Sequence, residues 1–230
     1  MWMKSKLFQK LGGGALERFG IRIWSKLQMP TLRARKKKDV VELLDKVRKE
    51  RQSLLTAFEA FLVHSLASAQ AKRPGAMAEV GVFAGASAKL ICEAKGDKTL
   101  HLFDTYEGLP PASEKDAGVH RVNQYTCSLE SVQAYLKGYP DVHFHKGIFP
   151  DSTAGLEEKT YSFCHFDVDL YEGTKGCLEY FYPRMIRGGI MLSHDYGLLA
   201  GVEKAFQEFF VDKPETIIEL PTTQCLVVKL

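Results

Sequence analysis

From residue 77 onward, short apolar runs alternate with segments of helical periodicity, and this alternation constrains the fold more than any other feature of the chain. A parallel strand is buried on both faces, so it forms a continuous apolar run, and a crossover helix must connect it to the next parallel strand. The pattern therefore predicts an α/β fold of the Rossmann-like class. We expect a seven-stranded, mostly parallel sheet with helices on both faces.

Seven strands and four helices are expected in this part of the chain. The predicted strands cover residues 77–83, 99–104, 142–147, 161–169, 189–194, 216–220 and 224–230, and the predicted helices cover 86–94, 129–136, 174–182 and 199–210. Only a short Pro-Thr-Thr turn separates the last two strands, which leaves no room for a crossover helix. These two strands are therefore predicted to be antiparallel.

The N-terminal region differs from the rest in charge. Residues 1–38 contain eleven Lys or Arg and one acid, for a net charge of +10, whereas the remaining chain carries −7. Apolar residues at near-helical spacing predict two short amphipathic helices in this basic arm, and Pro30 together with the basic run over 33–38 separates the arm from Asp39. A longer helix over 39–71 is expected next, with Asp39 as its cap. The expected parts are an arm over 1–38, a lid helix region over 39–72 and an α/β domain over 73–230.

Composition excludes several classes of protein. The five cysteines include no close pairs, which disfavours both a disulfide framework and a zinc site. No apolar run reaches the roughly 18 residues that a membrane-spanning helix needs. The composition predicts a cytoplasmic protein. The acidic body also disfavours a nucleic-acid substrate.

A glycine-containing turn after the first predicted strand indicates a cofactor site. Gly81 and Gly85 lie between this strand and the following helix, and Asp104 ends the second strand nineteen residues after Gly85. Glycine allows close backbone approach to a ligand, and an acid at this distance suits ribose hydroxyls. Phe83 occupies the position at which a dinucleotide-binding turn needs its second glycine. An adenosine-containing cofactor without a pyrophosphate is favoured; the alternative is a turn with only a structural role.

Ionisable residues follow two further strands. Asp167 and Asp169 end the fourth strand, and His194 and Asp195 follow the fifth. Because the carboxyl ends of parallel strands meet at one edge of a sheet, we expect these side chains to converge, where they can act as a base or bind a divalent cation. Asp169 can alternatively cap the next helix. Three strand histidines are predicted to be packed: His143, His145 and His165.

Four ordered motifs resemble those of the macrocin O-methyltransferase (TylF-like) family, within the class I S-adenosylmethionine-dependent methyltransferases. They are EVGVFAGAS at 79–87, LFDTYEGLP at 102–110, KGIFPDS at 146–152 and HFDVDLYE at 165–172. The resemblance covers residues 79–210. It implies that residues 73–230 bind S-adenosyl-L-methionine and transfer its methyl group to a hydroxyl of a sugar-bearing or small-molecule acceptor.

The resemblance also implies roles for individual residues. Glu79 and Gly81 would border the methionine part of the cofactor, Asp104 would hold the ribose, and residues 147–149 would lie beside the adenine. The complete predicted cofactor set is Glu79, Gly81, Gly85, Ser87, Asp104, Thr105, Gly147, Ile148, Phe149 and Asp167.

The predicted catalytic residues are Asp167, His194 and Asp195, and the same three form the candidate metal site. In the family, the acids at these positions are associated with Mg²⁺. His194 departs from that pattern, since Mg²⁺ prefers oxygen ligands. Two hypotheses follow: His194 is a general base that needs little help from a metal, or the three residues bind a different divalent cation.

Other functions and partners stay open. The rival functions are an NAD-dependent or nucleotide-sugar Rossmann enzyme and a non-enzymatic cofactor-binding scaffold. The arm can pack as a lid, contact a second copy, or attach to an anionic membrane surface and reach a lipid-linked acceptor. Acceptor contacts are expected from the arm, the helix after Asp39 and the loop over 105–123.

Overall fold

The computed structural model describes residues 14–116, 120–157 and 159–230, and is built around one seven-stranded sheet. The strand order is β3-β2-β1-β4-β5-β7-β6. The strands are β1 (Ala76–Val80), β2 (Leu100–Asp104), β3 (Val142–Lys146), β4 (Tyr161–Phe166), β5 (Met185–Ser193), β6 (Ile218–Glu219) and β7 (Cys225–Val228). β1 to β5 pair in parallel, and β7 is antiparallel to both β5 and β6. The predicted sheet and its antiparallel end are confirmed.

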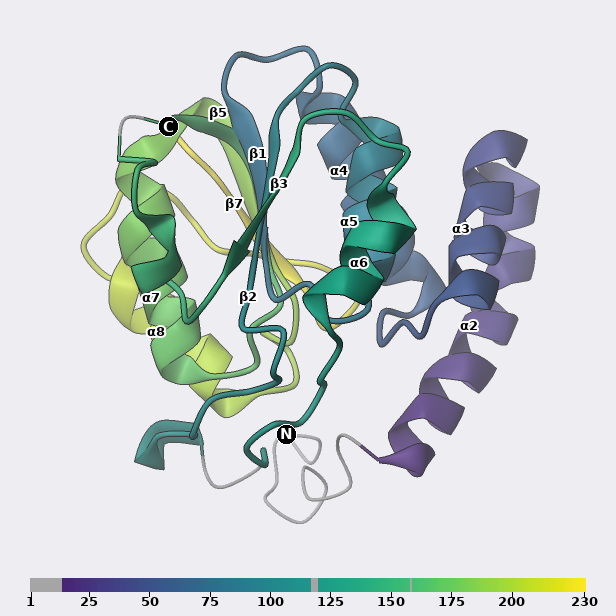
Figure 1. Ribbon diagram of the computed structural model, residues 1–230, viewed down its shortest axis with the longest axis horizontal. Helices are drawn as coiled ribbons and strands as arrows, with labels where there is room; N and C mark the ends of the chain where they lie inside the picture. Colours follow the sequence, from purple (N-terminus) through teal and green to yellow (C-terminus); the bar gives the residue numbers. More distant parts are fainter. Residues whose placement is uncertain (1–13, 117–119, 158) are drawn as a thin grey trace.

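Helices cover both faces of the sheet (Figure 1). One face carries α4 (Ala57–Gln70), α5 (Ala86–Ala94) and α6 (Leu129–Leu136), and the other carries α7 (Tyr171–Phe181) and α8 (Ala200–Phe210). α2 (Ala15–Arg35) and α3 (Lys38–Glu50) form an additional layer outside α4 and α5. Short 3₁₀ helices are η2 (Glu114–Asp116), η3 (Asp151–Thr153) and η4 (Tyr182–Arg184).

The central strands contribute side chains to two hydrophobic cores. Met77 and Phe163 lie in the core beneath α4 and α5, whereas Ala78 and Cys164 lie in the core beneath α7 and α8. Successive side chains of a strand point to opposite faces, so a strand covered on both sides is mostly apolar along its length. This requirement explains the continuous apolar runs. Within the described ranges, no helix combines the length and hydropathy needed to cross a membrane.

α2 continues through Pro30 to Arg35, within the segment that the sequence predicts to separate the arm from the next helix. The first predicted arm helix lies outside the described residues. Proline lacks an N–H and costs about 3 kcal/mol inside a helix. Met29 and Leu32, close to Pro30, are buried in the core that includes α4 residues. Burial of these side chains offsets the cost of the proline.

The single helix predicted over 39–71 is instead two helices, α3 and α4, separated by residues 51–56. Thr56 begins α4 with a capping box, in which Glu59 Oε2 accepts a hydrogen bond from the Thr56 N–H at 2.7 Å. Reciprocal capping of this kind fixes a helix start that apolar periodicity does not reveal. The predicted cap is also wrong, because Asp39 lies within the first turn of α3.

Two strands end three residues earlier than predicted. β1 ends at Val80, because Gly81 has a φ angle of +85° that a strand does not adopt, and β4 ends at Phe166, before the turn in which Asp169 has a φ angle of 58°. α7 consequently begins at Tyr171 rather than at residue 174. Its N-cap position is Leu170, so the capping role considered for Asp169 is wrong. β5 begins four residues before its predicted start at 189, and β6 is only two residues long.

The three strand histidines differ in burial. His165 is fully buried, as predicted, and His145 is half-buried with its ring stacked on Phe103 at 4.6 Å. His143 is exposed on β3, so its predicted packing is wrong. β3 is an edge strand, and its surface is consequently more open to solvent than that of the central strands.

Candidate active site

The loop between β1 and α5 has a backbone conformation that requires glycine. Gly81 has φ +85°, and a β-carbon placed on it would lie 1.8 Å from the Asp167 carbonyl oxygen. Gly85, at the N-cap of α5, also has left-handed geometry, with φ +80°. The two glycines let this loop turn sharply against the end of β4.

Asp104 ties the end of β2 to the same loop. Its Oδ2 accepts hydrogen bonds from the N–H groups of Val82 at 2.7 Å and Phe83 at 2.9 Å, and its Oδ1 accepts one from Tyr106 at 2.7 Å. The Asp104 carboxylate therefore holds the loop after β1 and the loop after β2 together at the carboxyl edge of the sheet, without the help of a ligand.

A cavity of about 790 Å³ opens at this edge. It is lined by most of the predicted cofactor and catalytic residues: Gly81, Ser87, Asp104, Thr105, Gly147, Ile148, Phe149, Asp167, His194 and Asp195. Such a volume is typical of small-molecule sites. The described residues of its wall include no Lys or Arg.

Two predicted cofactor residues, Glu79 and Gly85, do not line the cavity. Glu79 is fully buried behind the cavity wall, and its Oε1 lies 2.8 Å from His165 Nδ1. Burial raises the pKa of Glu79, and the neighbouring histidine opposes that change. The structure places Gly85 at the helix start, where it shapes the loop.

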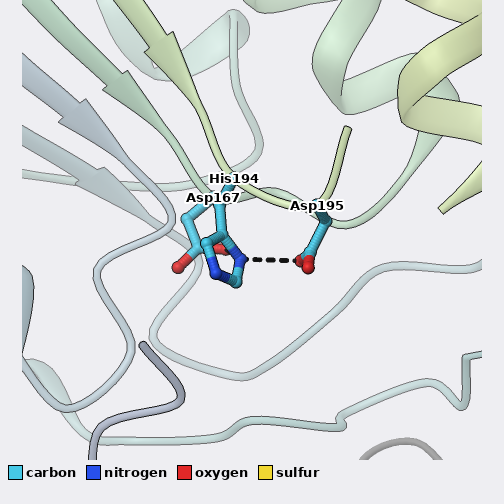
Figure 2. Close-up of side chains that lie close together, drawn as sticks. All are labelled: Asp167, His194 and Asp195. Atoms are coloured by element: carbon cyan, nitrogen blue, oxygen red, sulfur yellow. Dashed lines mark ion pairs between the residues drawn. The ribbon is translucent and has the colours of Figure 1, made fainter. Parts of the chain in front are cut away.

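Asp167, His194 and Asp195 converge at the ends of two neighbouring strands (Figure 2). The last paired residues of β4 and β5 are Phe166 and Ser193, and the His194 N–H donates to the Phe166 carbonyl at 2.8 Å. His194 Nδ1 lies 2.9 Å from Asp195 Oδ2 and 3.2 Å from Asp167 Oδ1. The expectation that these strand ends bring their side chains together is confirmed.

The opposite side of the His194 ring faces two residues that sequence analysis did not identify. His194 Nε2 lies 3.4 Å from Thr223 Oγ1 and 3.6 Å from Glu59 Oε2. Glu59 is on α4 and is almost completely buried, and Thr223 is in the turn before β7. The available sequence signal was the Thr56-x-x-Glu59 capping pattern, which locates a helix start but does not indicate a distant histidine.

Burial and neighbouring charges alter the ionisation of this cluster. Burial disfavours the charged form of His194, but the carboxylates of Asp195 and Asp167 outweigh it and raise the pKa of His194 well above its ordinary value. Burial opposes ionisation of Asp167, but His194 outweighs that effect and lowers the pKa of Asp167. Burial, followed by the charges of Asp195 and Asp167, raises the pKa of Asp169. The cluster therefore holds an ionised Asp167 beside a histidine that binds its proton tightly.

The remaining wall comes from the N-terminal helix and a loop. Glu17 and Trp24 on α2 line the cavity together with His120 and Tyr125. The Tyr125 hydroxyl donates to Glu17 Oε2 at 3.4 Å, which joins the two segments across the site. The arm and part of the predicted 105–123 loop thus border the cavity, and residues 52–56 border it between α3 and α4.

Comparisons with known proteins identify the family. The model of the macrocin O-methyltransferase (TylF) family matches residues 61–222. One relative is the 8-demethyl-8-(2,3-dimethoxy-alpha-L-rhamnosyl)-tetracenomycin-C 4'-O-methyltransferase of Streptomyces olivaceus. It is 30% identical over 141 residues, which cover 54% of each chain. Demethyldecarbamoylnovobiocin O-methyltransferase of Streptomyces niveus is 27% identical over 152 residues, covering 59% of this chain and 58% of the relative.

The matched part spans a little over half the length of these curated relatives. The solved structure of the O-methyltransferase NovP has the same fold, with a TM-score of 0.70 at 20% identity over 93% of this chain and 99% of that one. The family match extends over well more than half of the chain and includes all three residues of the converging cluster. The chain belongs to the macrocin O-methyltransferase family.

Proposed function

We propose that this chain is an S-adenosylmethionine-dependent O-methyltransferase that acts on a hydroxyl of a sugar-bearing small molecule. The observation that carries the proposal is one cavity in which a glycine loop and Asp104 lie beside the Asp167–His194–Asp195 cluster. The part of the cavity at the glycine loop and Asp104 suits an adenosine-containing cofactor, and the part at the three-residue cluster suits activation of a hydroxyl. Membership of a methyltransferase family supports this combination.

The cavity wall supports this cofactor over a dinucleotide. The described part of the wall has no Lys or Arg to bind a pyrophosphate. Acidic residues suit the cationic sulfonium of S-adenosylmethionine instead. Asp104 would accept hydrogen bonds from the ribose, Gly81 and Ser87 would border the methionine part, and the apolar Ile148 would cover the adenine. When bound, the cofactor supplies an electrophilic methyl group.

Methyl transfer requires an aligned acceptor and removal of the acceptor's proton. Asp167 and His194 lie at the cavity surface where these tasks can be performed. Asp195 and Asp167 raise the pKa of His194, so without a metal its ring already holds a proton and is not available to accept the proton of the hydroxyl. We therefore favour the second of the two hypotheses, in which Asp167, His194 and Asp195 bind a divalent cation that lowers the pKa of the acceptor hydroxyl.

The geometry of the cluster fits a metal. One ligand atom from each residue lies within 4.8 Å of the others. The two distances from His194 Nδ1, 2.9 and 3.2 Å, match the separation of about 3 Å between adjacent ligands that are each about 2.1 Å from one ion. One nitrogen and two oxygens favour Mn²⁺, Co²⁺ or Zn²⁺ over Mg²⁺.

The relatives support a glycosylated acceptor. The name of the Streptomyces olivaceus enzyme places its reaction on a rhamnosyl group. In this chain, the segments that would contact such an acceptor are α2, the 52–56 segment and the loop near Tyr125. These segments would form the lid of the site.

An exposed face of α2 supports attachment to an anionic membrane surface, where the acceptor would be presented. Among the described residues, five of the ten exposed large hydrophobic side chains lie on this helix. Leu16 and Trp24 also line the cavity, so the outward face consists of Phe19, Ile23 and Leu27. Arg18, Arg22 and Lys26 follow one another at four-residue intervals beside this face. Apolar side chains flanked by cations are typical of helices that lie in the interface of an anionic bilayer.

Co-sedimentation with vesicles tests the attachment. Phe19→Glu should reduce pelleting on phosphatidylglycerol vesicles by at least about fivefold. The control Val211→Glu, at an exposed apolar position at the C-terminal end of α8, should not change pelleting. Equal pelleting of the two variants, or a stable dimer that Phe19→Glu dissociates, would contradict the membrane proposal.

Calorimetric titration of S-adenosylhomocysteine, with and without Mn²⁺ and with NAD⁺ as a comparison ligand, tests the proposed activity. We expect micromolar binding of S-adenosylhomocysteine and no binding of NAD⁺. A screen of rhamnosylated acceptors with radiolabelled S-adenosylmethionine follows. Failure to bind S-adenosylhomocysteine in either condition would reject the methyltransferase proposal and favour a scaffold.

A further inference from the structure

We propose that Glu59 is a positioning residue, which acts with Thr223 to orient the His194 ring so that Nδ1 faces Asp167 and Asp195. This inference rests on the proposed function, since it assigns to an N-terminal helix the task of orienting a residue of the proposed metal site. It extends the site to a side chain on α4.

Glu59 is held by hydrogen bonds at both carboxylate oxygens. Oε2 accepts from the N–H and the hydroxyl of Thr56, each at 2.7 Å, and Oε1 accepts from the N–H of Thr223 at 3.1 Å and its hydroxyl at 2.7 Å. A backbone N–H is always a donor, so both oxygens must accept. A glutamine here would place its NH₂ against one of these N–H groups.

Capping alone does not explain this arrangement. A capping box needs one acceptor for the N-cap N–H, which Oε2 supplies to Thr56. Oε1 accepts both of its hydrogen bonds from Thr223, which is 164 residues away in the sequence, in the turn before β7. The second oxygen therefore connects α4 to the turn beside His194.

The hydrogen bond from Thr223 to Glu59 determines which nitrogen of His194 faces Thr223 and donates to it. Because the Thr223 hydroxyl donates to Glu59, its oxygen is free to accept from His194 Nε2, 3.4 Å away. Nδ1 is then directed to Asp167 and Asp195 on the other side of the ring. Histidines that bind metals commonly donate their second N–H in this way, and loss of such a partner lowers metal affinity about 10–100-fold.

The test is titration of Mn²⁺ alone, with free Mn²⁺ measured by electron paramagnetic resonance, on wild type and three variants. Glu59→Gln disrupts the acceptor pair, and Thr223→Val removes the hydroxyl while keeping the backbone bond. Ser128→Ala is the matched control, because it removes the N-cap acceptor of α6, which does not line the cavity. We expect Glu59→Gln and Thr223→Val to weaken Mn²⁺ binding about 10–100-fold, and Ser128→Ala to lower only the melting temperature.

Three results would overturn the inference. They are unchanged Mn²⁺ affinity in Thr223→Val, an equal loss in Ser128→Ala and Glu59→Gln, and a wild type that binds no Mn²⁺. S-adenosylhomocysteine is titrated into the same samples, so a failure of this inference is distinguished from a failure of the proposed function, which would abolish cofactor binding in wild type. Thr223→Val keeps the test decisive if Glu59→Gln does not fold.

Discussion

The Asp167 carbonyl oxygen lies 1.8 Å from the position that a β-carbon would occupy on Gly81. Both partners are backbone, so neither a rotamer change nor a shift of a flexible side chain relieves the conflict. The end of β4 can therefore approach the β1–α5 loop this closely only when residue 81 is glycine.

Gly81→Ala should lower S-adenosylhomocysteine affinity by at least about tenfold and reduce the melting temperature, because the loop must move away from Asp167. Gly96→Ala is the control, since Gly96 also has positive φ, +61°, but has open space around it. The control should lower the melting temperature by only about 2–4 °C, from φ strain of about 1 kcal/mol. Equal affinity in the two variants, measured by calorimetry, would contradict a steric role for Gly81.

Asp104→Ala should weaken S-adenosylhomocysteine binding about 10–100-fold, because the carboxylate both shapes the Val82–Phe83 loop and faces the cavity. A 2′,3′-dideoxy analogue of the ligand separates these two roles. If Asp104 binds the ribose, wild type should discriminate against the analogue and Asp104→Ala should bind both ligands equally. Discrimination that persists in the variant would assign Asp104 to loop structure alone.

His194→Asp should change the metal preference of the site. Three carboxylates form a set of oxygen ligands that Mg²⁺ favours, so the affinity for Mg²⁺ relative to Mn²⁺ should rise by at least about tenfold. Asp169→Asn, a change at the same edge but outside the proposed ligand set, serves as control. Calorimetric titration of each metal gives the ratio, and an unchanged ratio in His194→Asp would count against direct coordination by the histidine.

Glu215 should stabilise the folded protein at neutral pH and lose this effect in acid. It is buried, which opposes ionisation, but hydrogen bonds from Lys229 and Tyr182 outweigh burial and lower the pKa of Glu215 to about 2. A carboxyl group whose pKa falls on folding stabilises the native state above its ordinary pKa, and this contribution is lost as pH falls from about 4.5 toward 2.

Glu215→Gln should therefore melt at a lower temperature than wild type at pH 7, with a difference that shrinks below pH 4.5 and disappears near pH 2. Thermal unfolding followed by circular dichroism across this range measures the effect. Glu219→Gln, at an exposed position on β6, should follow wild type throughout. A difference for Glu215→Gln that is constant with pH would indicate a packing defect instead.

The sequence predicted best those contacts that follow from the order of parallel strands in the sheet. Asp167 and His194 could be brought together because each directly follows a parallel strand, and neighbouring parallel strands end at one edge. The extent of α2 could not be predicted in the same way. Pro30 is a strong local signal for a helix end, and only the burial of Met29 and Leu32 explains why the helix continues.

Glu59 and Thr223 illustrate a different limit. Each looks ordinary locally, the first as a capping acid and the second as a residue in a short turn. Their role depends on a contact between segments 164 residues apart, and no periodicity or motif encodes that distance. The alternating apolar runs predicted the sheet, but the packing of α4 against the sheet determines which residues face the Nε2 side of His194.

The two walls of the cavity come from separate stretches of the chain: the strand ends carry the proposed methyl-transfer residues, and α2 closes the opposite side with Glu17 and Trp24. Under the proposed function, recognition of the acceptor can therefore be changed separately from methyl transfer. A mutant library confined to the cavity-lining positions of α2 should alter the choice of acceptor while Asp167, His194 and Asp195 stay unchanged.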